Sequence, residues 1–315
     1  MNLMKFQSLR KVLSLLMCLF TFGVCSAIEI EINGIKYDVI KKANVARLID
    51  ANRPSGTFKV PEFVTYEGAQ CQVVEISASA FFRSESLNNV HIPKSVKKIG
   101  YDSFSECLEL KSVYITDIAA WCNIQFDNLS SNPVYDRNLY VDNQLATNLI
   151  IPMSVSIIKK LTFAGCSSIT NVSIPKSVTK IEESAFDMCP NLSTIEIPNS
   201  VLRINKCAFR SCENLKSITI PNQIKEIEAG LCWGCKSLET IKIPKTVILI
   251  NGGAFANCEG LKDVYCYAVN PPQISYDCFD NSEIEYATLY VPAASIQKYK
   301  SHVVWKRFGK IVAIK

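Results

Sequence analysis

The sequence has very few of the residues and motifs on which enzyme sites depend. Only two of its 315 residues are histidines, His91 and His302, and neither lies near a serine or cysteine motif. There is no G-x-S-x-G nucleophile turn and no glycine-rich phosphate loop. A single C-x-x-C motif, CWGC at residues 232–235, suggests a redox pair or half a zinc site, but no further ligands are spaced to complete one. We therefore predict a protein that is not an enzyme and holds no metal and no cofactor.

An excess of charge of one sign is also lacking. The N-terminal segment up to Ala27 holds three of the 34 basic residues and none of the 29 acidic ones, which leaves the rest of the chain with a net charge of +2. This balance excludes the basic footprint of a nucleic-acid-binding protein.

Long apolar runs are confined to the N-terminal segment. Basic residues precede an apolar run at residues 12–24, which leads into CSA at residues 25–27. This pattern is typical of a signal peptide cleaved after Ala27. A signal anchor and a lipoprotein cut before Cys18 or Cys25 are the alternatives. We expect an exported protein, secreted or held at the cell surface, with no transmembrane segment after cleavage.

What the sequence has in place of these features is a repeat. Residues 174–196, IPKSVTKIEESAFDMCPNLSTIE, align without a gap on residues 197–219, IPNSVLRINKCAFRSCENLKSIT. The Ile-Pro pair that opens each copy recurs at equal spacing, at Ile151, Ile174, Ile197, Ile220 and Ile243, and an earlier copy opens at Ile92. A fixed period in the low twenties predicts a solenoid.

One copy indicates how the chain runs. In LSTIEIPNSV, residues 192–201, alternation places Ile195 and Ile197 inside and Thr194 and Glu196 outside, and the proline ends the strand. A short second segment and a helical or tight turn return the remaining apolar residues to the core. Because one copy cannot bury its apolar face alone, we predict an α/β-type leucine-rich repeat solenoid with a parallel sheet on one face. Eight or nine turns at ~4.8 Å each would give a rod of about 40 Å.

The repeated string I-P-x-S-V-x-x-I-x-x-x-A-F-x-x-C-x-x-L-x-x-V-x-I resembles the BspA-like leucine-rich repeat family of exported bacterial proteins, roughly over residues 69–292. IEINGIKYDVI resembles the N-terminal hairpin of that family, with Asn33-Gly34 as the turn. The tail from Tyr265 onward resembles its C-terminal cap, which a solenoid needs to cover its last turn. The resemblance implies a non-catalytic binding module, adhesin-like or a scaffold.

These features divide the chain into a signal peptide (1–27), an N-terminal β-hairpin cap (28–68), the solenoid (69–265) and a degenerate last repeat with the C-terminal cap (266–315). One stretch, 116–150, departs from the regular repeat period, since Ile115 and Ile151 lie further apart than one full repeat. We interpret it as a repeat with an inserted loop, which either serves binding or is a harmless surface bulge.

Cysteines recur at one position of each copy, so that they stack in the fold. This predicted ladder comprises Cys107, Cys166, Cys189, Cys212, Cys235 and Cys258. Since stacked side chains point the same way, we expect buried thiols that pack as apolar groups and not a disulfide ladder. In the CWGC motif Cys235 is the ladder cysteine, and Cys232 stands where Phe186 and Phe209 stand in the preceding copies. The cysteines outside the ladder are better disulfide candidates, with their pairing left open: Cys71, Cys122, Cys266 and Cys278.

The outward positions of the predicted strands form the candidate binding face. The candidate ligand-binding residues are His91, Tyr114, Asn171, Ser173, Thr194, Glu196, Thr219, Thr240, Lys242 and Tyr265. Such a face suits an extracellular protein or a glycan, although threonine and serine are also simply good residues for a solvated strand. We expect a monomer with no nucleic-acid partner. The alternative function is a structural or accessory component of a cell-envelope complex.

Overall fold

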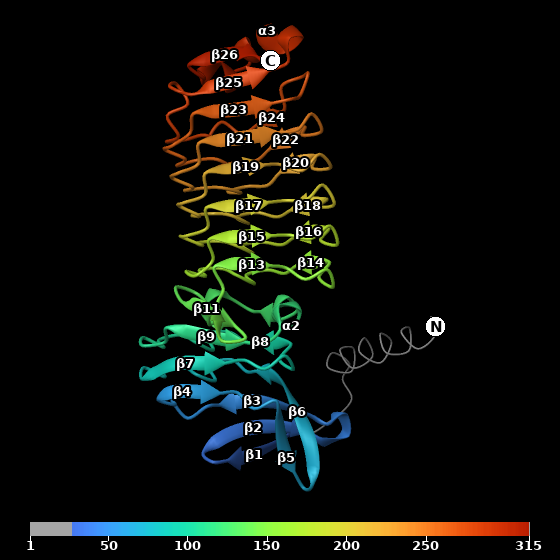
Figure 1. The fold of residues 1–315 in the computed structure, drawn as a ribbon, viewed down its shortest axis with the longest axis vertical. Coiled ribbons are helices and arrows are strands. Elements are labelled where there is room, and N and C mark those ends of the chain that lie inside the picture. Colours follow the sequence, from blue (N-terminus) through green and yellow to red (C-terminus); the bar gives the residue numbers. More distant parts are fainter. Residues whose placement is uncertain (1–26, 315) are drawn as a thin grey trace, which may run out of the picture.

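The computed structural model describes residues 27–314, so the predicted signal peptide lies almost entirely outside the described residues. The chain winds into a parallel-strand solenoid of about 12 turns with little helix (Figure 1). The leucine-rich repeat solenoid predicted from the regular repeat period is therefore confirmed. The expected eight or nine turns were too few, because some rungs lack the Ile-Pro signature, such as the one that holds Asn138.

Most rungs contribute one strand to a parallel ladder along the rod, which we name the front ladder. Successive strands are in register at the repeat period, so that Val172 pairs with Ile195. The strands are β4 (Gly56–Lys59), β7 (Leu87–His91), β9 (Ser112–Ile115), β11 (Asn138–Val141), β13 (Asn148–Ile150), β15 (Asn171–Ser173), β17 (Thr194–Glu196), β19 (Ser217–Thr219), β21 (Thr240–Ile243), β23 (Asp263–Cys266), β25 (Thr288–Val291) and β26 (Lys310–Ala313).

The Ile-Pro corner leads each chain segment into a second, shorter ladder. At this corner the N–H of Val201 donates to the carbonyl of Pro198 at 3.0 Å, which closes a turn just after the front strand. The two-residue strands that follow are β8 (Lys98–Ile99), β10 (Gln125–Phe126), β14 (Ile157–Ile158), β16 (Lys180–Ile181), β18 (Arg203–Ile204), β20 (Glu226–Ile227), β22 (Leu249–Ile250) and β24 (Gln273–Ile274).

The third side of a regular rung is a tight turn and not a helix. Ser184 and Met188 flank Ala185 and Phe186 and adopt left-handed backbone angles, with φ of 53° and 55°. The N–H groups of Ser184, Phe186 and Met188 donate to carbonyls one rung further on, at distances of 2.7 to 3.2 Å. These bonds offset the cost of placing residues other than glycine in the left-handed region.

The core is a set of buried columns that run along the rod. Phenylalanines stack from rung to rung, with ring centroids 5.4 Å apart for Phe163 and Phe186 and 5.8 Å apart for Phe186 and Phe209. Beside them lies the cysteine ladder, in which all six thiols are buried. The Sγ atoms of Cys189 and Cys212 lie 3.1 Å from the backbone oxygens of Phe163 and Phe186, respectively, in the preceding rung. The thiols therefore do more than pack as apolar groups, because they also donate weak hydrogen bonds between rungs.

The irregular stretch 116–150 builds its own rung and a hairpin. Asp117 caps α2 (Ile118–Cys122), accepting a bond from the N–H of Ala120 at 2.9 Å, and η2 (Leu129–Ser131) follows β10. A turn at Asp142 and Asn143 then folds β12 (Gln144–Leu145) antiparallel onto β11. The front ladder breaks at this point, since β12 and β13 end separate sheets, and its hydrogen bonding is interrupted again between β17 and β19.

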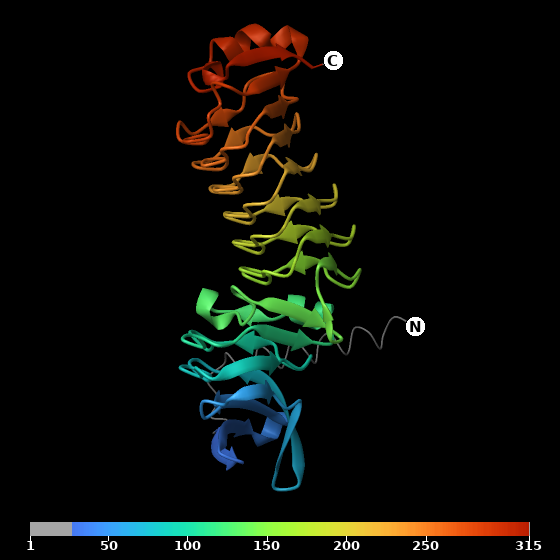
Figure 2. The same cartoon turned by 60° about the vertical axis from the view of Figure 1, so that its left-hand side comes forward.

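The two ends of the rod are closed differently. At the N-terminal end β1 (Ile28–Ile32) and β2 (Ile35–Ile40) form a hairpin that turns at Asn33 and Gly34, and η1 (Lys41–Ala43), β3 (Val45–Asp50), β5 (Phe63–Tyr66) and β6 (Ala69–Ile76) extend it. At the other end lie η3 (Ala293–Ser295), α3 (Ile296–Lys300) and η4 (Trp305–Arg307). This C-terminal cap seals the core with aromatic rings: Trp305 and Phe308 contact Phe279 at centroid distances of 5.9 and 5.3 Å. Figure 2 shows both caps from the side.

The disulfide expectation for the cysteines outside the ladder is wrong. Cys71, Cys122, Cys266 and Cys278 are all free and fully buried, each in its own packing environment. Cys266, for example, lies 3.1 Å from the hydroxyl of Tyr299. These thiols act as small core side chains, as the ladder cysteines do.

Candidate functional site

The outward side chains of the front ladder, which we name the strand face, form two columns. In one column strand pairing aligns His91 with Tyr114 and Tyr114 with Tyr140. Beyond the break, the same column runs through Ile150, Ser173, Glu196, Thr219, Lys242, Tyr265, Tyr290 and Val312. The sequence prediction placed His91, Tyr114 and Tyr265 on this face but missed Tyr140 and Tyr290.

Aromatic rings stack at both ends of this column. The centroids of His91 and Tyr114 lie 4.5 Å apart with a 12° angle between the rings, and those of Tyr114 and Tyr140 lie 4.7 Å apart. At the other end Tyr265 and Tyr290 stack at 4.4 Å. Because neighbouring rings cover one another's faces, each stack offers mainly ring edges and hydroxyl groups to a partner.

The surroundings of the histidine in the first stack favour its neutral form. Burial, and to a lesser degree the charge of Lys59, lowers the pKa of His91. Lys59 lies next to it, because β4 pairs with β7 in parallel and aligns the two residues. A neutral imidazole can stack on Tyr114 without bringing a second positive charge beside Lys59.

Polar side chains in the second column bond to each other. Asn171 donates from Nδ2 to Oδ1 of Asn148 at 2.6 Å, and Thr194 donates to Oδ1 of Asn171. Thr240 belongs to the same column and pairs with Ser217 on the next strand. Part of the hydrogen-bonding capacity of the middle of the face is thus used within the protein.

An apolar patch lies at the break in the front ladder. Ile150 is an apolar residue in the outward column, and 68% of its surface is exposed. Leu145 in β12 pairs with Tyr140 and is exposed as well. The hairpin therefore extends the stack of His91, Tyr114 and Tyr140 with aliphatic surface. The repeat period alone did not predict this apolar patch, because the hairpin lies outside the regular repeats.

The CWGC motif is part of the buried core. Cys232 and Cys235 are both fully buried, and burial raises the pKa of each thiol. A thiolate is therefore disfavoured at both positions, opposite to what a reactive pair needs. No group of histidine, cysteine or acidic residues suited to a metal ion occurs in residues 27–314.

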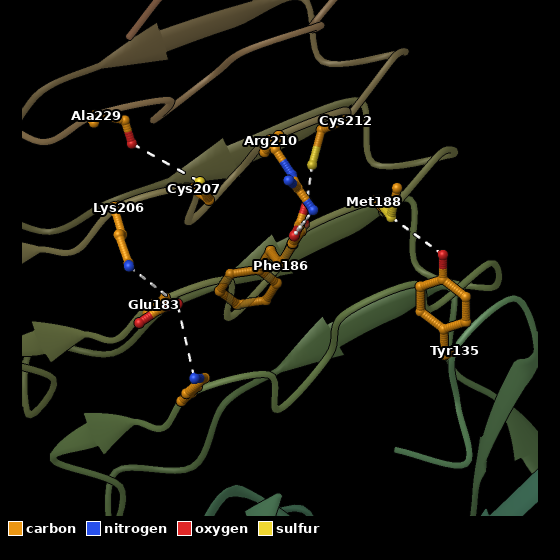
Figure 3. Close-up of polar contacts among 11 residues, drawn as sticks. Tyr135, Glu183, Phe186, Met188, Lys206, Cys207, Arg210, Cys212 and Ala229 are labelled. Carbon is orange, nitrogen blue, oxygen red and sulfur yellow. Dashed lines mark hydrogen bonds and ion pairs between the residues drawn. The ribbon is translucent and has the colours of Figure 1, made fainter. Parts of the chain in front are cut away.

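A second polar cluster, on the turn side, has a structural role. Arg210 makes two bonds to the carboxylate of Asp187, at 2.9 and 2.7 Å, and Asp187 is only 1% exposed. Figure 3 shows this region, in which the Tyr135 hydroxyl lies 3.3 Å from the sulfur of Met188 and the amine of Lys206 lies 3.5 Å from Glu183. Each contact joins different rungs, so the cluster ties the irregular rung to the regular ones.

The fold and these surfaces define a class of protein: a repeat solenoid whose buried groups serve packing and whose front strands expose one face along the rod. Six copies of the BspA type leucine rich repeat region match residues 58–132, 136–262 and 225–302. The chain therefore belongs to the BspA-type leucine-rich repeat family, as its sequence resemblance predicted.

Solved structures of similar chains are bacterial leucine-rich repeat proteins. A leucine rich cell surface protein from Faecalibacterium prausnitzii is 20% identical, with 93% of this chain and 96% of that chain covered and a TM-score of 0.36. The pneumococcal vaccine antigen PcpA is 15% identical, with 92% and 99% covered and a TM-score of 0.49. A leucine-rich repeat protein from Bacteroides ovatus is 19% identical, with 90% of each chain covered and a TM-score of 0.44. No curated protein matches the chain. No helix between residues 27 and 314 has the length and apolar character to cross a membrane.

Proposed function

We propose that this chain is a non-catalytic, exported binding module that holds a protein partner on its strand face. Membership of a family of bacterial leucine-rich repeat proteins supports the binding role, and the signal-peptide pattern of the N-terminal sequence supports export. Eleven of the twelve cysteines in the described residues are buried, Cys207 is partly exposed, and the buried carboxylate of Asp187 is paired with Arg210 of the next rung, so these groups serve packing.

The stacked aromatic residues are the observation that carries the proposal. Tyrosine edges and hydroxyls are typical of protein interfaces, where they combine apolar area with hydrogen bonding at low entropic cost. A sugar ring stacks on the face of an aromatic side chain, and in these stacks neighbouring rings cover both faces of Tyr114 and one face each of Tyr140, Tyr265 and Tyr290. The exposed aliphatic side chain of Leu145, which pairs with Tyr140, also favours a protein over a glycan.

Binding of the purified protein to a panel of extracellular matrix proteins and glycans tests the proposal. The face variant replaces Tyr114, Tyr140, Tyr265 and Tyr290 with alanine. The control variant replaces Tyr101 and Tyr286, which are exposed tyrosines outside the strand face, with 59% and 83% of their surface accessible. The control separates loss of the face from loss of tyrosine in general.

A protein ligand that binds the wild type and the control but not the face variant would support the proposal. A ligand that binds all three equally would contradict the placement of the site, and a glycan lost only in the face variant would contradict the protein preference. If no panel member binds and the protein co-purifies with envelope proteins from its native cells, the alternative function as a component of an envelope complex is favoured.

A further inference from the structure

The C-terminal end of the front ladder is an open strand edge. β26 pairs in parallel with β25 and is the last strand of its sheet (Figure 1). The N–H of Lys310 donates to the carbonyl of Ala287, the residue just before β25, at 3.4 Å, and the N–H of Ile314 donates to the carbonyl of Val291 in β25 at 2.8 Å. Since alternate residues of a parallel strand bond to opposite neighbours, the N–H and C=O groups of Ile311 and Ala313 point away from β25. No other described residue forms a backbone hydrogen bond with them.

This edge lies in a strongly basic setting. From residue 286 to the end of the sequence there are six lysines and arginines and no acidic residue. Lys300, Lys306 and Lys310 line a hollow of about 380 Å³ together with Ile311 and Val312 of the strand. Among the described residues, none of these three amines lies within 4.0 Å of a carboxylate.

The strand that carries this edge is held firmly in place. A Cβ on Gly309 would lie 2.0 Å from the carbonyl oxygen of Glu285, so that only glycine lets the chain enter β26 at this point. Just before it, Trp305 and Phe308 are buried against the core. A preorganised edge reduces the ordering cost of adding another strand.

We propose that the β26 edge binds an acidic, extended polypeptide segment by strand addition. The segment would pair its backbone with Ile311 and Ala313, and its carboxylates would meet Lys300, Lys306 and Lys310. The edge would bind through backbone groups of β26, whereas the strand face binds through outward side chains, so the inference does not depend on the proposed function. Val312 belongs to the strand-face column and also lines the hollow. If the lysines serve only to protect the edge from pairing, no such binding occurs.

The probe is a fluorescein-labelled peptide of four Glu-Val repeats, titrated with the whole protein and followed by anisotropy. Binding is expected at low salt and should weaken by about tenfold or more as the ionic strength rises well above 0.1 M, because the charges are exposed. A Lys-Val peptide should not bind, and a Glu-Val peptide N-methylated on alternate residues should lose at least about tenfold, because it keeps the charge but lacks the ladder donors.

Two variants separate charge from strand pairing. Replacing Lys300, Lys306 and Lys310 with glutamate should abolish binding. The matched control replaces three exposed lysines far from the cap with glutamate, and it should bind as the wild type does. These residues are Lys176, Lys225 and Lys245. Ala313→Pro removes an outward-facing donor and leaves the bonds to β25 intact, so it should weaken binding by about tenfold without unfolding the cap.

Hydrogen exchange gives a direct readout of the edge. On adding the Glu-Val peptide, the amides of Ile311 and Ala313 should gain protection. The proposal is overturned if the peptide does not bind. It is also overturned if Ala313→Pro and the N-methylated peptide bind unchanged, or if those two amides gain no protection. Equal binding of heparin with no dependence on Ala313 would indicate an anionic polysaccharide in place of a polypeptide.

Discussion

Residues 231 and 232 break the core pattern in a way that predicts a measurable coupling. In neighbouring rungs an alanine and a phenylalanine fill these positions, as at Ala208 and Phe209, and both are buried. Here a leucine stands in the alanine column and a cysteine in the phenylalanine column, and both remain buried. The two exchanges compensate in volume, so we infer that they share one space in the core.

The single variants should therefore be costly and the double variant mild. Leu231→Ala leaves a cavity and should lower the free energy of unfolding by about 2–5 kcal/mol. Cys232→Phe with Leu231 retained should cost about 1–3 kcal/mol through overpacking. The double variant restores the alanine–phenylalanine pair and should lie within about 1.5 kcal/mol of the wild type. The coupling energy is then about 1.5 kcal/mol or more, well above the few tenths found for independent sites.

Urea unfolding followed by circular dichroism measures these differences, with Trp233 as a fluorescent reporter in the same rung. An unchanged slope against urea for all four proteins checks that the variants lose stability and not cooperativity. The reciprocal pair Ala208→Leu and Phe209→Cys is a matched control one rung earlier, where the double change should again be milder than Phe209→Cys alone. A double variant as unstable as the sum of its singles would refute the shared space and with it the column assignment of Cys232.

Three further predictions use the same measurements. Gly165→Ala should lower the free energy of unfolding by about 2 kcal/mol or more, because the new Cβ would lie 2.5 Å from the ring of Tyr135. Gly234→Ala has the same left-handed backbone, but its nearest contact is a flexible side chain, so it should lower the free energy of unfolding by less. Cys212→Ser should be milder than Cys212→Ala, because a hydroxyl keeps the hydrogen bond to the preceding rung; equal losses would show that this bond contributes nothing. Burial lowers the pKa of His91, so the unfolded chain binds more protons than the folded chain below about pH 6.5. The free energy of unfolding should therefore fall on acidification from about pH 7 to 5.5. His91→Gln should reduce this dependence of stability on pH, and an unchanged dependence would show that another group causes it.

The solenoid itself could be predicted from the sequence because its determinants recur. Ile197, Val201 and Leu215 each have a counterpart one repeat period away, at Ile220, Ile224 and Leu238, and each counterpart occupies the same place in the next rung. The turn side could not be predicted in the same way. Ser184 and Met188 adopt left-handed backbone angles without being glycine or asparagine. The hydrogen bonds to the next rung that hold them in this region form only when the rungs stack.

The residues of the strand face were predicted where the repeat period is regular, and they were missed where the period changes. Tyr140 lies slightly more than one repeat period after its partner Tyr114, so counting in whole repeats passes it by. A local signal was present, because NLYV around Tyr140 and TLYV around Tyr290 repeat the alternation of SVYI and DVYC. The disulfide expectation failed for a different reason. Sequence spacing showed which cysteines leave the ladder but not that each one has its own buried environment.

The two proposed surfaces differ in a way that one variable can separate. The aromatic stacks of the strand face and the apolar patch beside them present neutral rings, aliphatic side chains and hydroxyls, so contacts made there should change little with ionic strength. The β26 edge draws on exposed lysines whose attraction to carboxylates is screened within about 10 Å at 0.1 M salt. A partner that binds through both surfaces would lose only part of its affinity as the salt concentration rises. The salt-independent part of that affinity should be lost in the face variant and kept in the lysine variant. Salt dependence measured in the two sets of variants therefore shows whether the tyrosine stacks or the β26 edge carries a given partner, even before that partner is mapped.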